Sequence, residues 1–238
     1  MVTAREKPAA KLWNIVSAPS NTESASALVI AIDGPAASGK SSVAQTLAAR
    51  HGFAYINSGA MYRAVTWSVL EAGIDPAEEA AVIAHLDQSP IGYTTQAGVA
   101  HFTIGGHDPG DELKSAAVND SVSIIASHRG VRERLVAQQR EFGKSGRIVM
   151  EGRDIGSVVF PDTPHKFYVT ASEEVRRKRR EKEGFTDDLA KRDKIDRSRK
   201  NSPLVIGEDA KVIDSSELSI DEVVDSITSH LGDALTSI

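Results

Sequence analysis

The stretch LVIAIDGPAASGKS, residues 28–41, decides the fold of this chain of 238 residues. Its first five residues form an apolar run that is typical of a buried strand. Residues 34–41 fit the phosphate-binding loop pattern G-x-x-x-x-G-K-[ST]. A helical pattern follows from Lys40 to about Arg50, with Val43, Ala44 and Leu47 on one face. Strand, loop and helix in this order predict a site for a nucleoside triphosphate.

The loop supplies the groups that bind phosphates. Its glycines let the backbone curl so that successive N–H groups point at phosphate oxygens, and the following helix adds its positive dipole end. Lys40 reaches the β- and γ-phosphates, and the Ser41 hydroxyl contacts Mg²⁺. The alternative is an ordinary glycine-rich turn between a strand and a helix. We predict that ATP is bound by the residues Gly34, Pro35, Ala36, Ala37, Ser38, Gly39, Lys40, Ser41 and Ser42.

Composition narrows the class of protein. The chain is 40% hydrophobic and 26% charged, which suits one globular α/β domain. A net charge of −5 argues against a nucleic-acid-binding surface, and the lack of cysteine removes disulfides and thiolate chemistry. No apolar stretch is long enough to span a bilayer. We expect a cytoplasmic protein that binds neither nucleic acid polymers nor membranes, with a flexible, non-catalytic extension at residues 1–26.

Strand-like and helix-like segments alternate after this extension. Further strands are predicted at residues 53–57, 147–150, 166–170 and 210–214, and helices at 58–71 and 113–142, the latter with a break near 128–130. Residues 90–94 and 99–104 flank a Gln-Ala-Gly turn and predict a small antiparallel hairpin. A capping-box match at residues 219–222 begins the last helix. We therefore predict an α/β fold in which helices flank a parallel sheet and ligands gather at the carboxyl ends of its strands.

Two polar clusters follow predicted strands. In the first, NSGAMYR at residues 57–63, Ser58 can cap a helix and bind an anion there, and Arg63 lies one turn later with a planar guanidinium suited to phosphate. The alternative is an ordinary helix cap with a solvated arginine. In the second, EGRD at residues 151–154, Glu151 lies directly after a strand and suits Mg²⁺ or its waters, while Arg153 and Asp154 can face a substrate. The alternative there is a structural turn.

A third cluster is basic. Residues 176–182 read RRKRREK, and Arg192, Asp196 and Arg199 follow at positions i, i+4 and i+7 on one predicted helix face. Gly184 separates the two segments. Such runs are usually solvated helix faces. A mobile, arginine-rich flap also fits this arrangement, because phosphoryl transfer requires positive charge and the exclusion of water.

Together these motifs resemble one family. IDGP at residues 32–35, GKSS at 39–42, SGAMYR at 58–63, EGRDIG at 151–156 with VFP at 159–161, and the late charged set strongly resemble bacterial-type cytidylate kinases, which are P-loop nucleoside monophosphate kinases. The resemblance covers residues 27–238 as one P-loop kinase domain, with the acceptor region at 58–142, the β insertion near 90–105 and an arginine-rich lid at 176–200. It implies transfer of the γ-phosphoryl group of ATP to CMP or dCMP, with Mg²⁺. We expect the chain to act as a monomer.

The resemblance also assigns roles to individual residues. It implies that Ser58, Arg63 and Arg153 hold the acceptor phosphate, and that Ser123, Arg132 and Asp154 read the cytosine. Arg192 and Asp196 would touch the sugar, and Arg199 would neutralise the reacting phosphates. The predicted catalytic residues are Lys40, Arg153, Asp154, Arg192 and Arg199. Many relatives have glycine where this chain has Ser41, so the hydroxyl on Mg²⁺ comes from Ser41 or Ser42. The lid before Gly184 is shorter than expected, which leaves open which of its arginines contact the transferring group.

The chemistry of cytosine supports the same substrate. Its exocyclic amino group donates to a carboxylate such as Asp154, whereas uracil presents an acceptor oxygen at that position. The alternative role for Asp154 is an ion pair with Arg132 or Arg153 that only shapes the pocket.

Two other functions remain open at this point. The first is a kinase for UMP, dTMP or shikimate, against which residues 151–156 and the hairpin argue. The second is a nucleotide-dependent switch, but the chain lacks the Asn-Lys-x-Asp motif that reads guanine. The seven histidines form no ligand pair, so zinc is not expected.

Overall fold

The computed structural model describes residues 27–144, 146–182, 184, 189–199 and 203–235, with only the backbone of residues 191 and 192. The predicted extension at residues 1–26 therefore lies outside the described residues, and so does the side chain of Arg192. Within the part that is described, no helix is long and apolar enough to cross a membrane.

One mixed sheet forms the centre of the described chain, with the strand order β3-β4-β2-β5-β1-β6-β7. The strands are β1 (Leu28–Asp33), β2 (Ala54–Asn57), β3 (Ile91–Gln96), β4 (Val99–Ile104), β5 (Arg147–Gly152), β6 (Lys166–Thr170) and β7 (Lys211–Asp214). Strand β1 pairs in parallel with β5 and β6, and β7 extends the parallel part beyond β6. The predicted α/β fold is confirmed.

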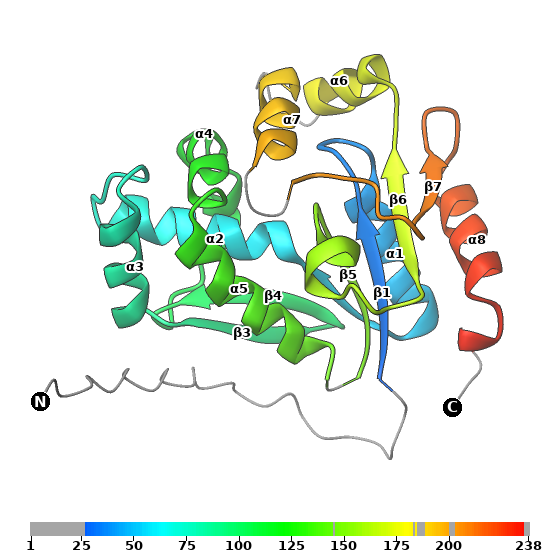
Figure 1. The fold of residues 1–238 in the computed structure, drawn as a ribbon, viewed down its shortest axis with the longest axis horizontal. Coiled ribbons are helices and arrows are strands. Elements are labelled where there is room, and N and C mark those ends of the chain that lie inside the picture. Colours follow the sequence, from blue (N-terminus) through cyan, green and yellow to red (C-terminus); the bar gives the residue numbers. More distant parts are fainter. Residues whose placement is uncertain (1–26, 145, 183, 185–188, 200–202, 236–238) are drawn as a thin grey trace, which may run out of the picture.

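Helices cover both faces of this sheet (Figure 1). They are α1 (Lys40–His51), α2 (Ser58–Glu71), α3 (Glu79–Gln88), α4 (Ala116–Ile125), α5 (Arg129–Phe142), α6 (Glu173–Lys182), α7 (Leu189–Ser198) and α8 (Ile220–Leu231). Short turns are η1 (Gly110–Lys114), the π-helical turn η2 (Ile155–Val159) and η3 (Gly232–Leu235). The predicted capping box begins α8, because the Ser219 side chain accepts from the Glu222 backbone and the Glu222 carboxylate accepts from the Ser219 backbone.

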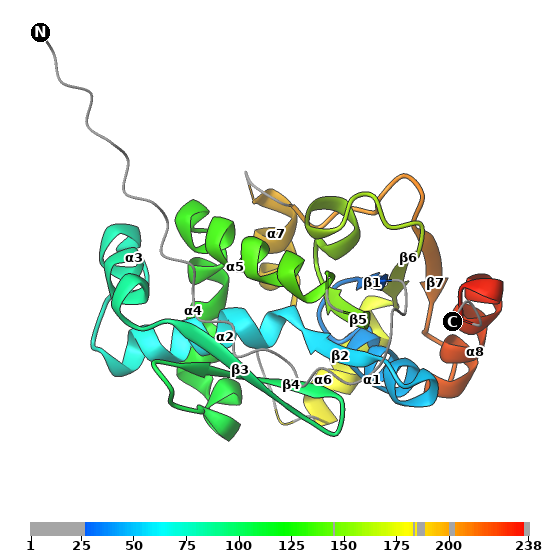
Figure 2. The same ribbon diagram turned by 90° about the horizontal axis from the view of Figure 1, so that it is seen from below.

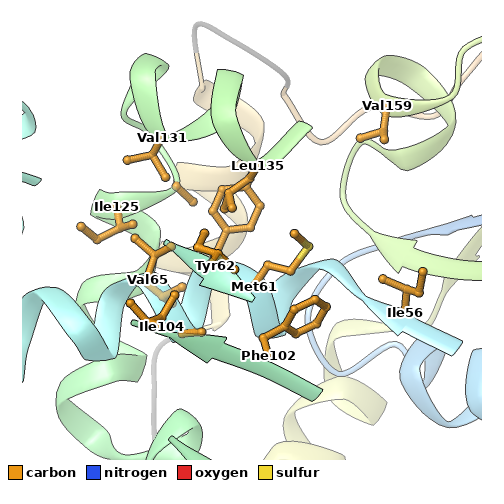
Figure 3. Close-up of a cluster of buried hydrophobic side chains, with 14 of the residues drawn as sticks. Ile56, Met61, Tyr62, Val65, Phe102, Ile104, Ile125, Val131, Leu135 and Val159 are labelled. Carbon is orange, nitrogen blue, oxygen red and sulfur yellow. The ribbon is translucent and has the colours of Figure 1, made fainter. Parts of the chain in front are cut away.

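Each face of the sheet buries its own hydrophobic cluster, because successive side chains of a strand point to opposite sides. In β1, Ile30 and Ile32 pack with α1 and α8, whereas Ala31 packs with the cluster around α2. That second cluster includes Met61 and Phe102 (Figure 3). Strand β1 is therefore buried on both faces, which explains its continuous apolar sequence and holds the loop that follows it in a fixed place.

The hairpin β3–β4 is antiparallel, as the sequence predicted, and runs from the pair Ile91–Ile104 to the pair Gln96–Val99. Strand β4 also pairs in parallel with β2, through Val99 and Tyr55, so the hairpin extends the central sheet at one edge. Figure 2 shows this hairpin far from α8, which lies near the opposite edge.

Two elements differ from the sequence prediction. Helix α3 had not been predicted, and β5 continues through Glu151 and Gly152, where the prediction ended the strand at Met150. Glutamate is depleted in strands, so its presence marked a strand end in the sequence. Glu151 is nevertheless part of the strand. It is only 2% exposed, and its carboxylate accepts hydrogen bonds from neighbouring hydroxyls.

Candidate active site

A cavity of about 240 Å³ opens at the carboxyl ends of the central strands. Helices α6 and α7 lie above this edge of the sheet (Figure 1). Most of the predicted site residues line this one cavity, namely Ala36, Ala37, Gly39, Lys40, Ser41, Ser42, Ser58, Arg63, Ser123, Arg132, Arg153, Asp154, Asp196 and Arg199. Gly34, Pro35 and Ser38 belong to the same loop without lining the cavity. The structure thus brings together residues that are far apart in the sequence.

The phosphate loop leads directly into the first turn of α1. Gly39 precedes this helix with a left-handed φ of 85°, and no side chain caps the helix there. The first-turn N–H groups can therefore bind an anion, aided by the helix dipole. Gly34 begins the loop against β6, where a Cβ atom would lie 2.1 Å from the carbonyl oxygen of Val169. Only glycine fits this position.

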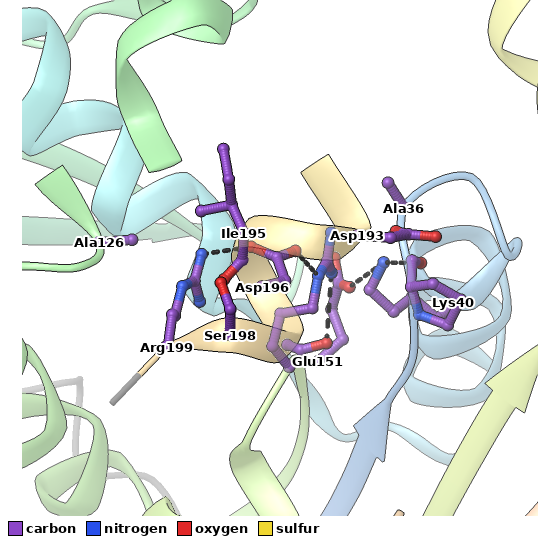
Figure 4. A network of polar contacts seen from close by, with 12 residues as sticks. Ala36, Lys40, Ala126, Glu151, Asp193, Ile195, Asp196, Ser198 and Arg199 are labelled. Carbon is purple, nitrogen blue, oxygen red and sulfur yellow. Dashed lines mark hydrogen bonds and ion pairs between the residues drawn. The ribbon is translucent and has the colours of Figure 1, made fainter. Parts of the chain in front are cut away.

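Glu151 lies between the loop and the acceptor side of the cavity (Figure 4). The Ser41 hydroxyl donates to its Oε1 atom at 2.7 Å, and the Tyr55 hydroxyl donates to the same atom at 3.2 Å. Lys40 Nζ lies 3.9 Å from Glu151 Oε2 and donates to the carbonyl oxygen of Pro35 at 3.0 Å. A hydroxyl and a carboxylate side by side are hard oxygen ligands of the kind that Mg²⁺ prefers.

The described residues hold no group of three or more His, Cys, Asp or Glu side chains suited to a metal ion. The Ser41–Glu151 pair fits a cation that takes its remaining ligands from water and from phosphate oxygens, which is the usual setting of Mg²⁺ in kinases.

The start of α2 corrects one prediction. Asn57, not Ser58, caps the helix, because the Asn57 side chain accepts from the backbone N–H of Ala60 at 3.0 Å. The Ser58 hydroxyl instead donates to the carbonyl oxygen of Glu151 at 2.8 Å. Ser58 nevertheless lines the cavity, so its side chain remains next to the predicted acceptor phosphate.

Arg63 and the lid arginine Arg180 share one acceptor that the sequence did not reveal. The Oδ1 atom of Asn119 on α4 accepts from Arg63 at 2.8 Å and from Arg180 at 3.5 Å. Its amide nitrogen donates to the carbonyl oxygens of Lys114 and Ser115, so Oδ1 faces the arginines. Asn119 therefore links the acceptor region to the lid.

At another part of the cavity wall, Arg132 on α5 forms a buried ion pair with Asp154. The same arginine donates to the carbonyl oxygen of Ala126 at 3.2 Å and lies over the ring of Tyr62, 5.5 Å from its centroid. The Tyr62 hydroxyl has no hydrogen-bond partner among the described residues, and burial raises its pKa above the usual value. Tyr62 was not among the predicted site residues, although it lies within the predicted SGAMYR motif.

On the lid, the carboxylate of Asp196 joins two predicted phosphate-binding arginines (Figure 4). Arg153 donates to it at 2.9 Å, and Arg199 pairs with its other oxygen. Although burial acts in the opposite direction, the Asp196 charge raises the pKa of Arg153 above its usual value. Burial lowers the pKa of Arg199, and Asp196 opposes that change, while Arg132 and Arg153 add to it.

Helix α6 divides its basic residues between two faces. Arg177 and Lys178 are exposed and pair with Glu181 and Glu174, four residues away. Arg176 and Arg180 have no acidic residue four positions away and are buried. Arg176 pairs with Asp193 of α7 at 2.7 Å and donates to Ala36 of the phosphate loop at 3.3 Å. The two buried arginines therefore point toward α7, the phosphate loop and the cavity.

The cavity carries an excess of positive charge. Its cationic residues are Lys40, Arg63, Arg132, Arg153, Arg180 and Arg199, and its acidic residues are Glu151, Asp154 and Asp196. The cations lie on both the phosphate-loop side and the acceptor side, which suits two phosphate-bearing ligands that meet in the middle. Fold and site together define a phosphate-loop kinase.

Comparisons with known proteins give the family. Residues 30–232 match the family described as cytidylate kinase. The cytidylate kinase of Bacillus pumilus (strain SAFR-032) is 42% identical over 211 residues, which cover 84% of this chain and 94% of that protein. The cytidylate kinase of Rhodococcus opacus (strain B4) is 42% identical over 213 residues, 84% of this chain and 93% of that protein. The chain belongs to the cytidylate kinase family, so the resemblance identified from its sequence is confirmed.

Proposed function

We propose that this protein transfers the γ-phosphoryl group of ATP to CMP and dCMP, giving ADP with CDP or dCDP. One observation carries the proposal: the phosphate loop and a second, arginine-rich phosphate site share one cavity, next to the Arg132–Asp154 pair. A phosphate loop alone is compatible with many functions. A separate acceptor site beside it is what a kinase of small molecules requires.

On the donor side, the loop N–H groups hold the ATP phosphates and Lys40 contacts the β- and γ-phosphates. Lys40 is 6% exposed, so its charge acts in a poorly solvated place where it is worth more than in water. Ser41 would hold Mg²⁺ together with Glu151 as a ligand or through water. When bound, Mg²⁺ neutralises charge on the phosphate oxygens.

On the acceptor side, Ser58, Arg63 and Arg153 hold the monophosphate. Asp154 then accepts from the cytosine amino group, and Arg132 and Ser123, which line the same cavity, help to read the base. The buried Arg132–Asp154 pair supports this role, because it fixes a charged carboxylate inside the pocket. The pair is also compatible with the alternative role, in which Asp154 only shapes the pocket. Substitution of Asp154 distinguishes these two roles.

The lid completes the site. Arg192 and Asp196 would contact the sugar, and Arg199 would neutralise the reacting phosphates. The acceptor phosphate oxygen attacks the γ-phosphorus in line with the departing ADP, and no covalent enzyme intermediate is needed. Positioning, positive charge and exclusion of water supply the catalysis.

The test is ADP release from Mg-ATP with CMP, dCMP, UMP, AMP or dTMP as separate acceptors, plus a control without acceptor. We expect fast release with CMP and dCMP alone. Fast release with a different acceptor would keep the kinase and discard the cytosine pocket. Equal, slow release in every reaction would leave only a nucleotide-hydrolysing protein.

A further inference from the structure

A buried carboxylate links the two halves of the site, and none of the roles described above uses it. Asp33 ends β1 and directly precedes Gly34, the first residue of the phosphate loop. Its Oδ1 atom accepts from the backbone N–H of Ile155 at 2.8 Å, and its Oδ2 atom accepts from that of Gly156 at 2.8 Å. These two N–H groups open the turn that directly follows Arg153 and Asp154.

The first two N–H groups of the turn have the Asp33 carboxylate as their acceptor. Asp154 precedes η2 with φ −148° and ψ 23°, and its own side chain makes no capping hydrogen bond. The two carboxylate bonds therefore satisfy backbone donors that would otherwise be buried without an acceptor. They also set where the preceding two side chains point, because Arg153 and Asp154 are joined to the turn by one or two peptide bonds.

We infer that Asp33 is a positioning residue that fixes Arg153 and Asp154 relative to the phosphate loop. Strand β1 is paired on both sides, so Asp33 itself is held by Gly152 of β5 and Tyr168 of β6 in register. When the carboxylate is lost, the first two N–H groups of the turn lose their acceptor, so the start of the turn can shift. Loss of Asp33 is thus expected to affect the acceptor nucleotide more than ATP.

The protonation state of Asp33 is part of this role. Burial raises its pKa to about 7, against the lowering effect of the two backbone hydrogen bonds. Asp154 raises this pKa further and Arg153 lowers it, and Tyr168 on β6 also faces the group. Lys166 of β6 packs beside Gly156, but its amine pairs with Asp209 at 2.8 Å. Below the pKa, a proton on one oxygen competes with an N–H donor, so the turn is held less firmly.

The inference rests on the proposed cytidylate kinase activity and is tested with Asp33→Asn, which keeps the shape of the side chain. The amide offers one acceptor oxygen and turns its NH₂ group toward an N–H donor. We expect the KM for CMP to rise at least about tenfold, with weaker rejection of UMP and an unchanged KM for ATP. Asp162→Asn is the matched control, because Asp162 is exposed in the loop just after the same turn. It is expected to behave as wild type.

The pH profile provides the second readout. The wild-type KM for CMP is expected to rise as the pH falls through the Asp33 pKa of about 7, and this component is expected to vanish in Asp33→Asn. The phosphate of CMP itself titrates near a pH of about 6, but this affects both enzymes equally. The ratio of the two KM values for CMP at each pH therefore reports Asp33 alone.

A second variant covers the case in which Asp33→Asn does not fold. In Gly156→Ala the new Cβ atom would lie 3.1 Å from the Lys166 Cγ atom and 3.4 Å from Asp33 Oδ2, which disturbs the same contact from the other side. We expect the KM for CMP to rise in this variant too. Parallel pH profiles for wild type and Asp33→Asn, or equal increases in both KM values, would overturn the inference. A wild-type enzyme without CMP kinase activity would instead overturn the proposed function.

Discussion

Arg132 and Asp154 pair inside the cavity from different elements, α5 and the turn after β5, and both side chains are less than a tenth exposed. A buried pair of this kind is costly to break, because the remaining charge stays desolvated. The pair therefore presents a charged carboxylate at a fixed place in the pocket. Such a group can accept from the amino group of cytosine and faces a lone pair in uracil.

Asp154→Asn is expected to lower the preference for CMP over UMP by about 5- to 150-fold, the effect of about 1–3 kcal/mol for one lost pairing. The measurement is the ratio of kcat/KM values for the two acceptors. Asp120→Asn, an exposed position on α4, is the control and is expected to keep the wild-type ratio. Unchanged discrimination in Asp154→Asn would leave Asp154 with a purely structural role.

Lys40→Ala is expected to lower kcat at least about 100-fold, because a positioned cation on the reacting phosphates is lost. Lys40 contacts the Pro35 carbonyl oxygen and lies near Glu151, so loss of this side chain also removes neighbouring positive charge from that carboxylate. Thermal unfolding checks that the variant is folded. Normal turnover by a folded Lys40→Ala protein would contradict the assignment of the phosphate loop.

The Mg²⁺ requirement can separate Ser41 from Ser42. Only for Ser41 does the structure give a bond to Glu151, at 2.7 Å from its Oε1 atom, although both serines line the cavity. Ser41→Ala is expected to raise the Mg²⁺ concentration for half-maximal activity about tenfold or more, whereas Ser42→Ala is expected to leave it unchanged. The measurement is a Mg²⁺ titration at saturating ATP and CMP. The reverse result would move the ligand to Ser42.

Asn119→Ala tests the link between the acceptor region and the lid. Without its Oδ1 atom, Arg63 and Arg180 lose their shared acceptor, so both guanidiniums are less well placed for phosphate. We expect the KM for CMP to rise about tenfold and kcat to fall, as a small misplacement costs reactivity. Asp120→Ala on the exposed side of α4 is the control. A change in unfolding temperature with unaltered kinetics would show that Asn119 serves stability only.

Much of the fold was predictable because its strands are buried on both faces. Residues 28–32 form an apolar run and residues 166–170 have an apolar centre at 167–169, and the structure confirms both as parts of β1 and β6. The end of β5 was mispredicted, since Glu151 carries its charge into the strand, where the hydroxyls of Ser41 and Tyr55 and the nearby Lys40 amine stabilise it. Those partners come from other strands and helices, so a local pattern cannot reveal them.

In the candidate site, too, local motifs were predictable from the sequence, whereas contacts between distant residues were not. The phosphate loop and EGRD are local motifs, so the sequence alone predicts their residues. Asn119 bonds to Arg63, which is 56 positions away in the sequence, and Asp33 bonds to Ile155, which is 122 positions away. No local pattern contains partners at such separations. Asn57 has the capping role instead of Ser58 because the helix begins at Ser58, so Asn57 is the preceding residue and its side chain accepts from Ala60.

The division of α6 into two faces gives the last prediction. Arg180 is buried and lines the cavity, whereas Arg177, on the same helix, is exposed and pairs with Glu181. Arginines that stabilise the transferring phosphoryl group contribute about 1,000-fold or more to kcat in other phosphoryl-transfer enzymes, so Arg180→Ala is expected to lower kcat at least about 100-fold. Arg177→Ala removes a surface pair worth at most about 1 kcal/mol and is expected to leave kcat unchanged.

Single-turnover measurements at saturating ATP and CMP compare the two variants directly, because they report the transfer step apart from product release. Arg180→Lys adds a graded step, since lysine keeps the charge but lacks the planar fork, and is expected to recover only part of the rate. Equal rates for Arg177→Ala and Arg180→Ala would mean that the lid acts through its overall charge. In that case the inward position of Arg180 beside Asn119 would have no part in the transfer.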